Sequence, residues 1–346
     1  MIAKLSPLPL FHTAAAQEYQ TTPGKMPAML QMLRDAIQTG LVEISLPAAQ
    51  KRYAILFAGG EPVNIYSLQS PVKRIMPNSR LEKLFQGFAP QEEVSLRVLS
   101  LTPQTIRMVK IWIEQNIEVP HSTLPTIQIE SHLAALKKDG PALIYYRWPS
   151  AEALTLLAGH GEPLLHTLFL SGDRVLHSAG SIISLLDWHE PECVFTIMKS
   201  NLASQAWDEY ILHHTFVLFL GSFIPKIEKL ASRVVASAMI RDINFAATAH
   251  SWNIYITTSS TTDQTIFPSP EDAAEVYQRL ISIAVQRAEA VLGYQTIHGV
   301  VREILVKMNS PFRKIFQRHI HIDNHSFPTA ELLSATRITT TQHIHH

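Results

Sequence analysis

The segment from His319 to His325 combines the residue types and the spacing that best suit chemistry. In an extended chain every second side chain lies on the same face of the backbone. Four residues of ligand type follow that spacing, namely His319, His321, Asp323 and His325. Imidazole nitrogens and a carboxylate suit zinc or another borderline metal ion, so one hypothesis is a metal-dependent hydrolytic enzyme that uses segment 319–325. We prefer a solvent-exposed tail with no bound metal, because the histidine enrichment simply continues to the last residues.

A second group of reactive residue types surrounds the lone cysteine: Asp187, His189, Glu190, Glu192 and Cys193. A Cys–His pair or a carboxylate–His site can be drawn from them. We prefer an exposed turn that leads into a strand, with Cys193 as a small core residue. The glycine-rich turns at 59–60 and 159–161 lack the spacing of nucleotide-binding loops, and no nucleophile elbow is present. We therefore expect no catalytic residue and no cofactor.

Segment 302–318 carries a basic patch in which a single acid, Glu303, accompanies the cations Arg302, Lys307, Arg313, Lys314 and Arg318. A further hypothesis is a regulator that binds nucleic acid through this patch. Exposed aromatic residues between the cations would favour that hypothesis, and the segment has almost none. We interpret the patch as a solvated helix face and do not expect nucleic acid as the partner.

Composition favours a globular protein of more than one domain. The 346 residues are many for one core, and hydrophobic residues make up 46% of them. Twenty-nine basic and 29 acidic residues balance, which does not favour bulk binding to nucleic acid or to an anionic membrane. One cysteine excludes an intrachain disulfide and fits a reducing compartment, so we expect a cytoplasmic protein.

The most apolar run, Tyr210–Pro225, contains two histidines and is short for a bilayer, so it predicts a buried helix and no membrane span. We expect this run to pack between neighbouring parts of the chain, so that aspartate at both Leu218 and Leu220 would cause unfolding or aggregation.

The elements that would position these residues follow one order twice: helix, strand, hairpin, helix, strand. In the first copy we expect helices at 27–38 and 81–88 and strands at 41–46, 53–57, 63–68 and 94–101. In the second we expect a helix ending near 140, strands at 142–148 and 193–198, and a helix at 182–188. The hairpin segments Leu56–Val63 and Leu168–Val175 match, which predicts equivalent turns at Gly60 and Gly172 and an extra segment, 152–163, in the second copy.

The fold class that we predict is α+β, with two duplicated small α/β modules with antiparallel hairpins, followed by a mainly α-helical C-terminal domain. In the last third we expect helices at 224–250, 269–292, 294–308 and 311–318, a strand at 252–258, and a polar loop up to Gln264. The predicted boundaries are a lead segment 1–25, module one at 26–120, module two at 121–205, a helical domain at 206–320, and a His-rich tail at 321–346 that we expect to be flexible.

The second copy, with Leu168–Ala179, Leu185-Leu186-Asp187-Trp188 and Phe195, resembles the PATAN-type domain of bacterial signalling proteins. The first copy departs from the pattern at Ser67, where alanine is usual, and has Phe85 or Phe88 in place of the tryptophan region. The resemblance covers residues 26–102 and 127–200. It implies adaptor domains that bind protein partners and have no catalytic residues. We therefore expect a non-enzymatic, cytosolic regulatory or scaffold protein in bacterial signalling, with an unidentified protein partner and with a homo-oligomer as an open alternative.

Overall fold

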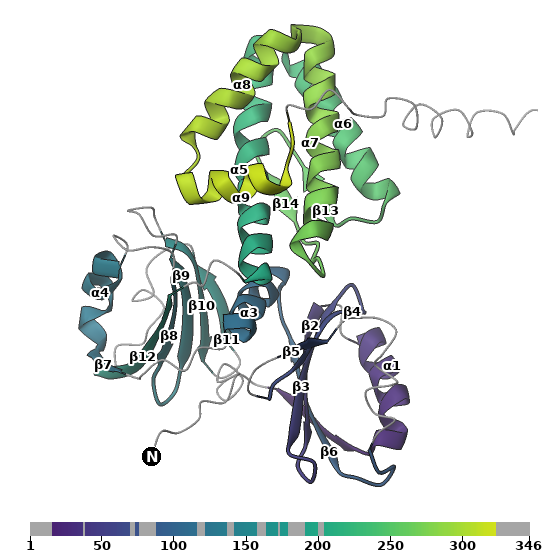
Figure 1. Ribbon diagram of the computed structural model, residues 1–346, viewed down its shortest axis with the longest axis vertical. Coiled ribbons are helices and arrows are strands. Elements are labelled where there is room, and N and C mark those ends of the chain that lie inside the picture. The colour runs from purple at the N-terminus through teal and green to yellow at the C-terminus, as the bar shows by residue number, and fades with distance from the viewer. Residues whose placement is uncertain are drawn as a thin grey trace, which may run out of the picture.

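The computed structural model describes residues 16–36, 39–69, 73–75, 88–115, 122–136, 142–157, 164–171, 174–178, 191–199 and 204–322. Two six-stranded antiparallel sheets occupy the N-terminal part, and a group of helices follows them (Figure 1). The fold class is α+β, as predicted. The predicted helices at 81–88 and 182–188 lie almost wholly outside the described residues, as does nearly all of the His-rich tail.

The first sheet has the strand order β1-β6-β2-β3-β4-β5. Its strands are β1 (Gln17–Thr21), β2 (Thr39–Leu46), β3 (Lys51–Ala58), β4 (Glu61–Ser67), β5 (Lys73–Ile75) and β6 (Val94–Ser100). A short 3-10 turn, η2 (Pro23–Lys25), leads into helix α1 (Met26–Ala36), which packs on one face of the sheet. Strand β1 lies inside the predicted lead segment 1–25, and its five residues pair with β6, so the sheet begins before residue 26.

Strand β2, which was predicted at 41–46, is buried on both faces. Val42 and Ile44 pack under α1, whereas Leu41 on the opposite face belongs to the central core. Glu43 shares the Leu41 face and is 2% exposed. Its carboxylate pairs with Arg52, and its second oxygen lies 4.0 Å from the guanidinium of Arg97. A buried carboxylate is tolerated here because cations on both neighbouring strands face it.

The second sheet has the order β7-β12-β8-β9-β10-β11. Its strands are β7 (Ser122–Pro125), β8 (Ala142–Arg147), β9 (Glu152–Leu157), β10 (Leu164–Ser171), β11 (Arg174–Ser178) and β12 (Glu192–Lys199). A turn, η3 (Thr126–Gln128), leads into helix α4 (Ile129–Leu136), which packs on one face. Counted from the first strand of each sheet, both sheets have the same strand order, and each first strand precedes a 3-10 turn and a helix. Common origin of the two modules stays a prediction.

The predicted equivalence of Gly60 and Gly172 is wrong. Gly59 and Gly60 have positive φ in the turn between β3 and β4. Gly172, which lies outside the described residues, falls between β10 and β11. Strand β10 holds the place of β4 in the sheet order, because segment 152–157 forms strand β9 and is not an insertion. The repeated sequence pattern therefore matches hairpins that are one strand apart.

The C-terminal part contains helices α5 (Gln205–Leu230), α6 (Arg233–Ala249), α7 (Pro270–Leu292), α8 (Tyr294–Lys307) and α9 (Ser310–His319). A small hairpin of β13 (Ile254–Ile256) and β14 (Thr261–Asp263) joins α6 to α7. Strand β14 occupies part of the segment that was predicted as a loop. Helix α7 begins as predicted, because the Ser269 hydroxyl accepts the backbone N–H of Asp272 at 3.1 Å and Pro270 occupies the first turn.

The predicted continuous helix at 224–250 is wrong, since the chain breaks at Ser232. Helix α5 ends at Leu230, and the backbone of Ser232 is extended. Ser232 is the N-cap of α6, because its hydroxyl accepts the backbone N–H of Val235 at 3.3 Å. Pro225 lies inside α5, and the helix continues past it to Leu230. Sequence periodicity runs through both helices and therefore hides the break.

Helix α3 (Pro103–Gln115) lies between the two sheets at the base of α5 (Figure 1). One apolar cluster includes the inner faces of both sheets, α3 and the C-terminal helices. Trp112 of α3 stacks on Tyr145 of β8 with ring centroids 5.9 Å apart. In α5, Phe216 stacks on Tyr277 of α7 at 4.2 Å. The two sheets and the C-terminal helices thus meet in one central core through α3 and α5, while α1 and α4 each cover a separate core on the outer face of a sheet.

The apolar run at 210–220 lies largely inside this core, as predicted, but one of its apolar residues is exposed. Leu220 is fully buried, whereas Leu218 is 44% exposed. Within the described residues, α5 is the one helix that is long and apolar enough to cross a membrane. In the most apolar 18 residues of this helix, 56% are buried inside the protein. A core helix also meets that criterion, so the absence of a membrane span stays a prediction.

Candidate functional site: a buried polar cluster

Charged and polar side chains meet inside the protein where α3, α5 and the β14–α7 connection converge. We call Arg107 and Lys110 of α3, Glu209 and His213 of α5, Asp263 of β14 and Tyr277 of α7 the junction cluster. Each of these side chains is at most 13% exposed. Buried charges are rare in proteins unless they are paired, and clusters of them are candidate functional sites.

Lys110 and Glu209 form the first half of the cluster. The ammonium group of Lys110 contacts the carboxylate of Glu209 and donates to the carbonyl of Phe267 at 2.8 Å and to that of Pro268 at 3.4 Å. The other carboxylate oxygen of Glu209 accepts the backbone N–H of Phe267 at 3.3 Å. Burial raises the pKa of Glu209, and the nearby Lys110 opposes that shift. The pair thus holds both polar groups of the Phe267 backbone.

Arg107 and Asp263 form the second half. The guanidinium of Arg107 donates to the carbonyl of Thr265 at 2.6 Å and to that of Asp263 at 3.2 Å, and it lies 3.7 Å from the Asp263 carboxylate. Tyr277 donates its hydroxyl to the same carboxylate at 2.6 Å. Burial raises the pKa of Asp263, and the positive charge of Arg107 opposes that shift. Segment 263–268 is therefore bound through its backbone carbonyls to two cations of α3.

His213 completes the cluster beside Asp263, with its Nε2 3.7 Å from Oδ2 of the carboxylate. Burial lowers the pKa of His213 well below its usual value, and the neighbouring Arg107 lowers it further. A buried histidine next to a guanidinium is neutral near pH 7. It is a polar neighbour of Asp263 and not its counter-ion.

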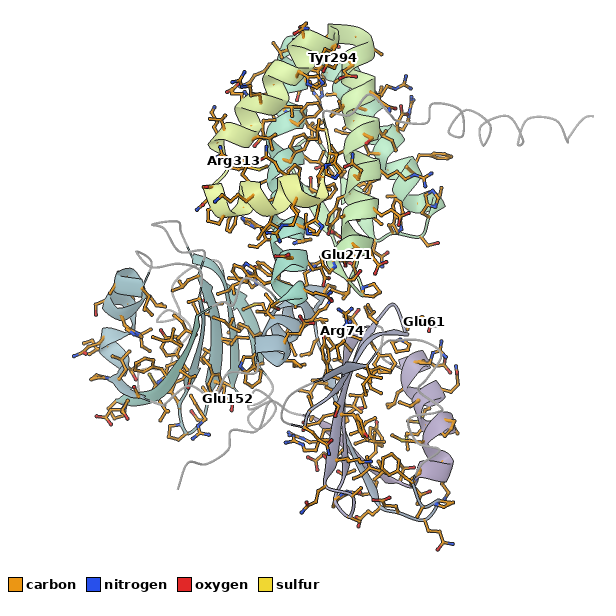
Figure 2. The ribbon with its side chains drawn as sticks, in the orientation of Figure 1. Glu61, Arg74, Glu152, Glu271, Tyr294 and Arg313 are labelled. Atoms are coloured by element: carbon orange, nitrogen blue, oxygen red, sulfur yellow. The ribbon has the colours of Figure 1, made fainter. Side chains whose placement is uncertain are left out.

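A second set of hydrogen bonds joins the first sheet to the beginning of α5. Glu114 of α3 accepts the Tyr66 hydroxyl at 2.8 Å and the backbone N–H of Ala206 at 2.8 Å. A carboxylate suits the N-terminus of α5, because the first helical N–H groups lack partners within the helix. Arg74 of β5 donates to Gln205 at 2.5 Å, and Figure 2 shows Arg74 at the boundary between the first sheet and the helices. These contacts fix the first sheet against α5.

The chemistry of the cluster is that of a fixed connection. Residue types that serve as general acids and bases elsewhere are present, namely lysine, glutamate, aspartate and histidine. Here, however, Lys110 and Arg107 direct their donors at carboxylates and backbone carbonyls. These hydrogen bonds hold backbone segments in place, and the side chains of Arg107 and Lys110 are used for structural contacts.

The residues of the predicted metal site are only partly described. His319 is the last residue of α9, so its backbone is helical and the extended spacing does not begin there. Its Nε2 lies 3.8 Å from the Asp208 carboxylate of α5, while the backbone N–H of His321 donates to Gln278 at 2.6 Å. Asp323 and His325 lie outside the described residues. Within the described part of the chain, no group of three or more metal-binding side chains is brought together.

Of the group around the cysteine, Asp187, His189 and Glu190 lie outside the described residues. Glu192 is exposed, and Cys193 is buried beneath α4. The Cys193 thiol donates to the carbonyl of Leu124 at 3.5 Å, and burial raises its pKa to about 12. A thiol that stays protonated and buried is a weak nucleophile.

The basic patch has more acidic neighbours than its sequence indicates. Lys307 pairs with Glu303 at 2.8 Å, and Arg318 pairs with Asp208 at 3.0 Å. Asp208 is distant in sequence, so its role was not visible there. For the remaining cations of the patch, Arg302, Arg313 and Lys314, the described residues provide no ion pair.

Sequence reasoning missed the junction cluster. The available signal was the presence of Arg107 and Lys110 between the apolar residues of α3, and of Glu209 at the start of the apolar α5. No family model matches the chain, and no curated protein or solved structure was found to be similar to it. The resemblance to PATAN-type domains therefore stays a prediction.

Proposed function

We propose that this chain is a non-enzymatic, cytoplasmic regulatory or scaffold protein that acts through protein–protein contacts. The observation that carries the proposal is the junction cluster, in which the ionisable groups fix α3 against α5 and the connection between β14 and α7. The resemblance of the two modules to PATAN-type adaptor domains adds bacterial signalling as the setting. The partner would be a protein.

Exposed apolar side chains in the C-terminal part of the chain could form the surface that binds a partner protein. Several large apolar residues of the C-terminal helices and of strand β13 are more than half exposed: Leu230, Val234, Phe245, Tyr255, Val291 and Val306. Clustered apolar residues on a protein surface mark interaction sites more often than catalytic ones. The proposed role thus combines a rigid frame with exposed binding surfaces.

The test is cross-linking of the full chain in cells of its native host, followed by purification and mass spectrometry. The wild type should yield a protein partner in a fixed ratio, and light scattering of the purified chain should show whether a second copy is also bound. Absence of any partner, together with turnover of a small-molecule substrate by the purified chain, would overturn the proposal. Elemental analysis of untagged protein tests the metal alternative, because stoichiometric zinc that is lost on His319→Ala with His321→Ala would favour a hydrolytic enzyme.

A further inference from the structure

One side of α6 is exposed along its length and carries a mixed apolar and cationic stripe. Val234 is 78% exposed and Phe245 is 72% exposed. Arg241 lies between them in the sequence, and its side chain is 75% exposed. The opposite side of the helix is buried in the core through Ala236, Met239, Ile240, Ile243 and Ala247.

Helical geometry places these three residues on one line. With about 3.6 residues per turn, Val234, Arg241 and Phe245 point in directions that differ by less than about 45°. The same geometry separates Val234 from Phe245 by roughly 16 Å along the axis. This length matches about three turns of a partner helix, so the stripe is long enough for a recognition element rather than a single contact.

Tyr255 adds an exposed aromatic side chain on the β13–β14 hairpin, which is attached to α6. In β13, Ile254 and Ile256 face the core, and Tyr255 between them is 62% exposed. Asn244 of α6 donates to the backbone carbonyl of Ile256 at 2.8 Å and accepts its N–H at 2.9 Å. Because Asn244 is next to Phe245, this double hydrogen bond fixes the hairpin beside the aromatic end of the stripe. We call Val234, Arg241, Phe245 and Tyr255 the α6 surface.

The segment that carries the α6 surface has more basic than acidic residues. Between residues 233 and 262 the sequence has two arginines and one acidic residue, Asp242. Arg287 of α7 holds the Asp242 carboxylate at 2.6 Å, while Arg241 lies 3.7 Å from it. The side chain of Asp242 is 28% exposed, whereas Arg233, Arg241 and Arg287 are all exposed, so cations outnumber the one carboxylate in this region. Phenylalanine, tyrosine and arginine are the residue types enriched at the centres of protein interfaces.

We propose that the α6 surface is the docking site for an acidic amphipathic segment of a partner protein. Its apolar residues would cover Phe245 and Tyr255, and its carboxylates would face Arg233 and Arg241. This inference rests on the proposed function and names the surface and the chemistry of the partner. A helix with acidic residues beside an apolar stripe fits both the length and the charge of the site.

The same charges disfavour the other occupants. A two-fold dimer through this surface would bring Arg241 against the arginines of a second copy, because a two-fold interface joins a patch to itself. An anionic bilayer attracts clusters of about four to eight cations, whereas the cations named at the α6 surface are Arg233, Arg241 and Arg287, and one of these holds Asp242.

The experiment is a selection from a displayed library of helical peptides with randomised surface positions, using the full chain as bait. Recovered peptides should be enriched in Asp and Glu beside Leu and Phe, and their affinity should fall as salt concentration rises. Phe245→Ser and Arg241→Glu should each weaken a recovered peptide by about tenfold or more in fluorescence anisotropy. Val306→Ser on α8 removes an equally exposed apolar residue on the other side of the helices and should leave the affinity unchanged (Figure 1).

Three results would overturn the inference: peptides without acidic enrichment, affinities unchanged by both α6 variants, or loss of self-association as the main effect of Phe245→Ser. Binding of the chain to phosphatidylserine vesicles that Arg241→Glu abolishes would assign the surface to a membrane instead. Cross-linking in the native host separates the two proposals. A partner captured equally by wild type and Phe245→Ser would leave the proposed function standing and exclude the α6 surface as its docking site. No partner with either protein, together with turnover of a small-molecule substrate by the purified chain, would overturn the proposed function.

Discussion

Removal of both members of the Lys110–Glu209 pair should destabilise the protein about as much as removal of one member, and by less than the sum of the two single removals. Lys110→Met leaves the Glu209 carboxylate buried without its cation, and Glu209→Leu leaves the ammonium group buried without its anion. Isolated charges of this kind cost about 3–5 kcal/mol of unfolding free energy. If the two residues were independent, the double variant would lose about 6–10 kcal/mol.

The double variant, Lys110→Met with Glu209→Leu, has no buried charge at this position. Its remaining cost comes from the backbone N–H and C=O of Phe267, which lose their partners. An unpaired buried backbone group costs about 1–3 kcal/mol. The two groups together cost about 2–6 kcal/mol, so we expect a loss for the double variant that is similar to that of either single variant.

Equilibrium urea unfolding, followed by tryptophan fluorescence and by circular dichroism, measures these differences. Trp207 is fully buried two residues before Glu209, so its emission reports on the cluster directly. Arg302→Met, which also replaces a cation by methionine on a helix but at an exposed position, should leave the urea midpoint unchanged. Single variants as stable as the wild type, or a double variant that loses the full sum, would refute the idea that the pair acts as a unit.

Three further predictions concern burial. Burial lowers the pKa of His213, so as pH falls below about 6.5 the unfolded chain binds a proton at this residue before the folded chain does. The free energy of unfolding then falls by up to about 1.4 kcal/mol per pH unit until the folded pKa is reached. In urea unfolding between pH 7 and 5, His213→Gln should lose less stability than wild type, and an equal loss would contradict the lowered pKa of His213. Leu220→Asp should lower stability by more than about 4 kcal/mol, whereas Leu218→Asp should remain folded and soluble, as thermal unfolding would show. Cys193 should react with a thiol reagent in urea but not in the native protein, and rapid native labelling would show that the thiol is accessible.

The sequence predicted the elements whose signals are local. Helix α7 begins where Ser269 and Pro270 provide a cap and a first turn, and β3 and β4 flank the glycine turn as expected. Strand β1 could not be found this way, because Gln17–Thr21 is mostly polar and becomes a strand by pairing with β6. The break at Ser232 was missed because apolar periodicity continues on both sides of it.

The junction cluster was out of reach for a different reason. Its partners are separated by 99 residues for Lys110 and Glu209, and by 157 for Lys110 and the carbonyl of Phe267. Half of its acceptors are backbone carbonyls, which have no residue-type signature. A charged residue inside an apolar helix indicates that a partner exists, but the fold decides which residue it is.

The junction cluster and the α6 surface are connected through the packing of α6 on α5 and α7. A buried ion pair adds little net stability, because desolvation offsets the attraction between the charges. Arrangements that separate the charges are costly, however, so the cluster selects one placement of α3 against α5 and the 263–268 connection. Helix α6 packs on α5 and α7, which contribute Glu209 and Tyr277 to the cluster. A partner bound at the α6 surface would therefore be held in a fixed position relative to the first sheet, and loss of the cluster charges should alter that position without removing the surface itself.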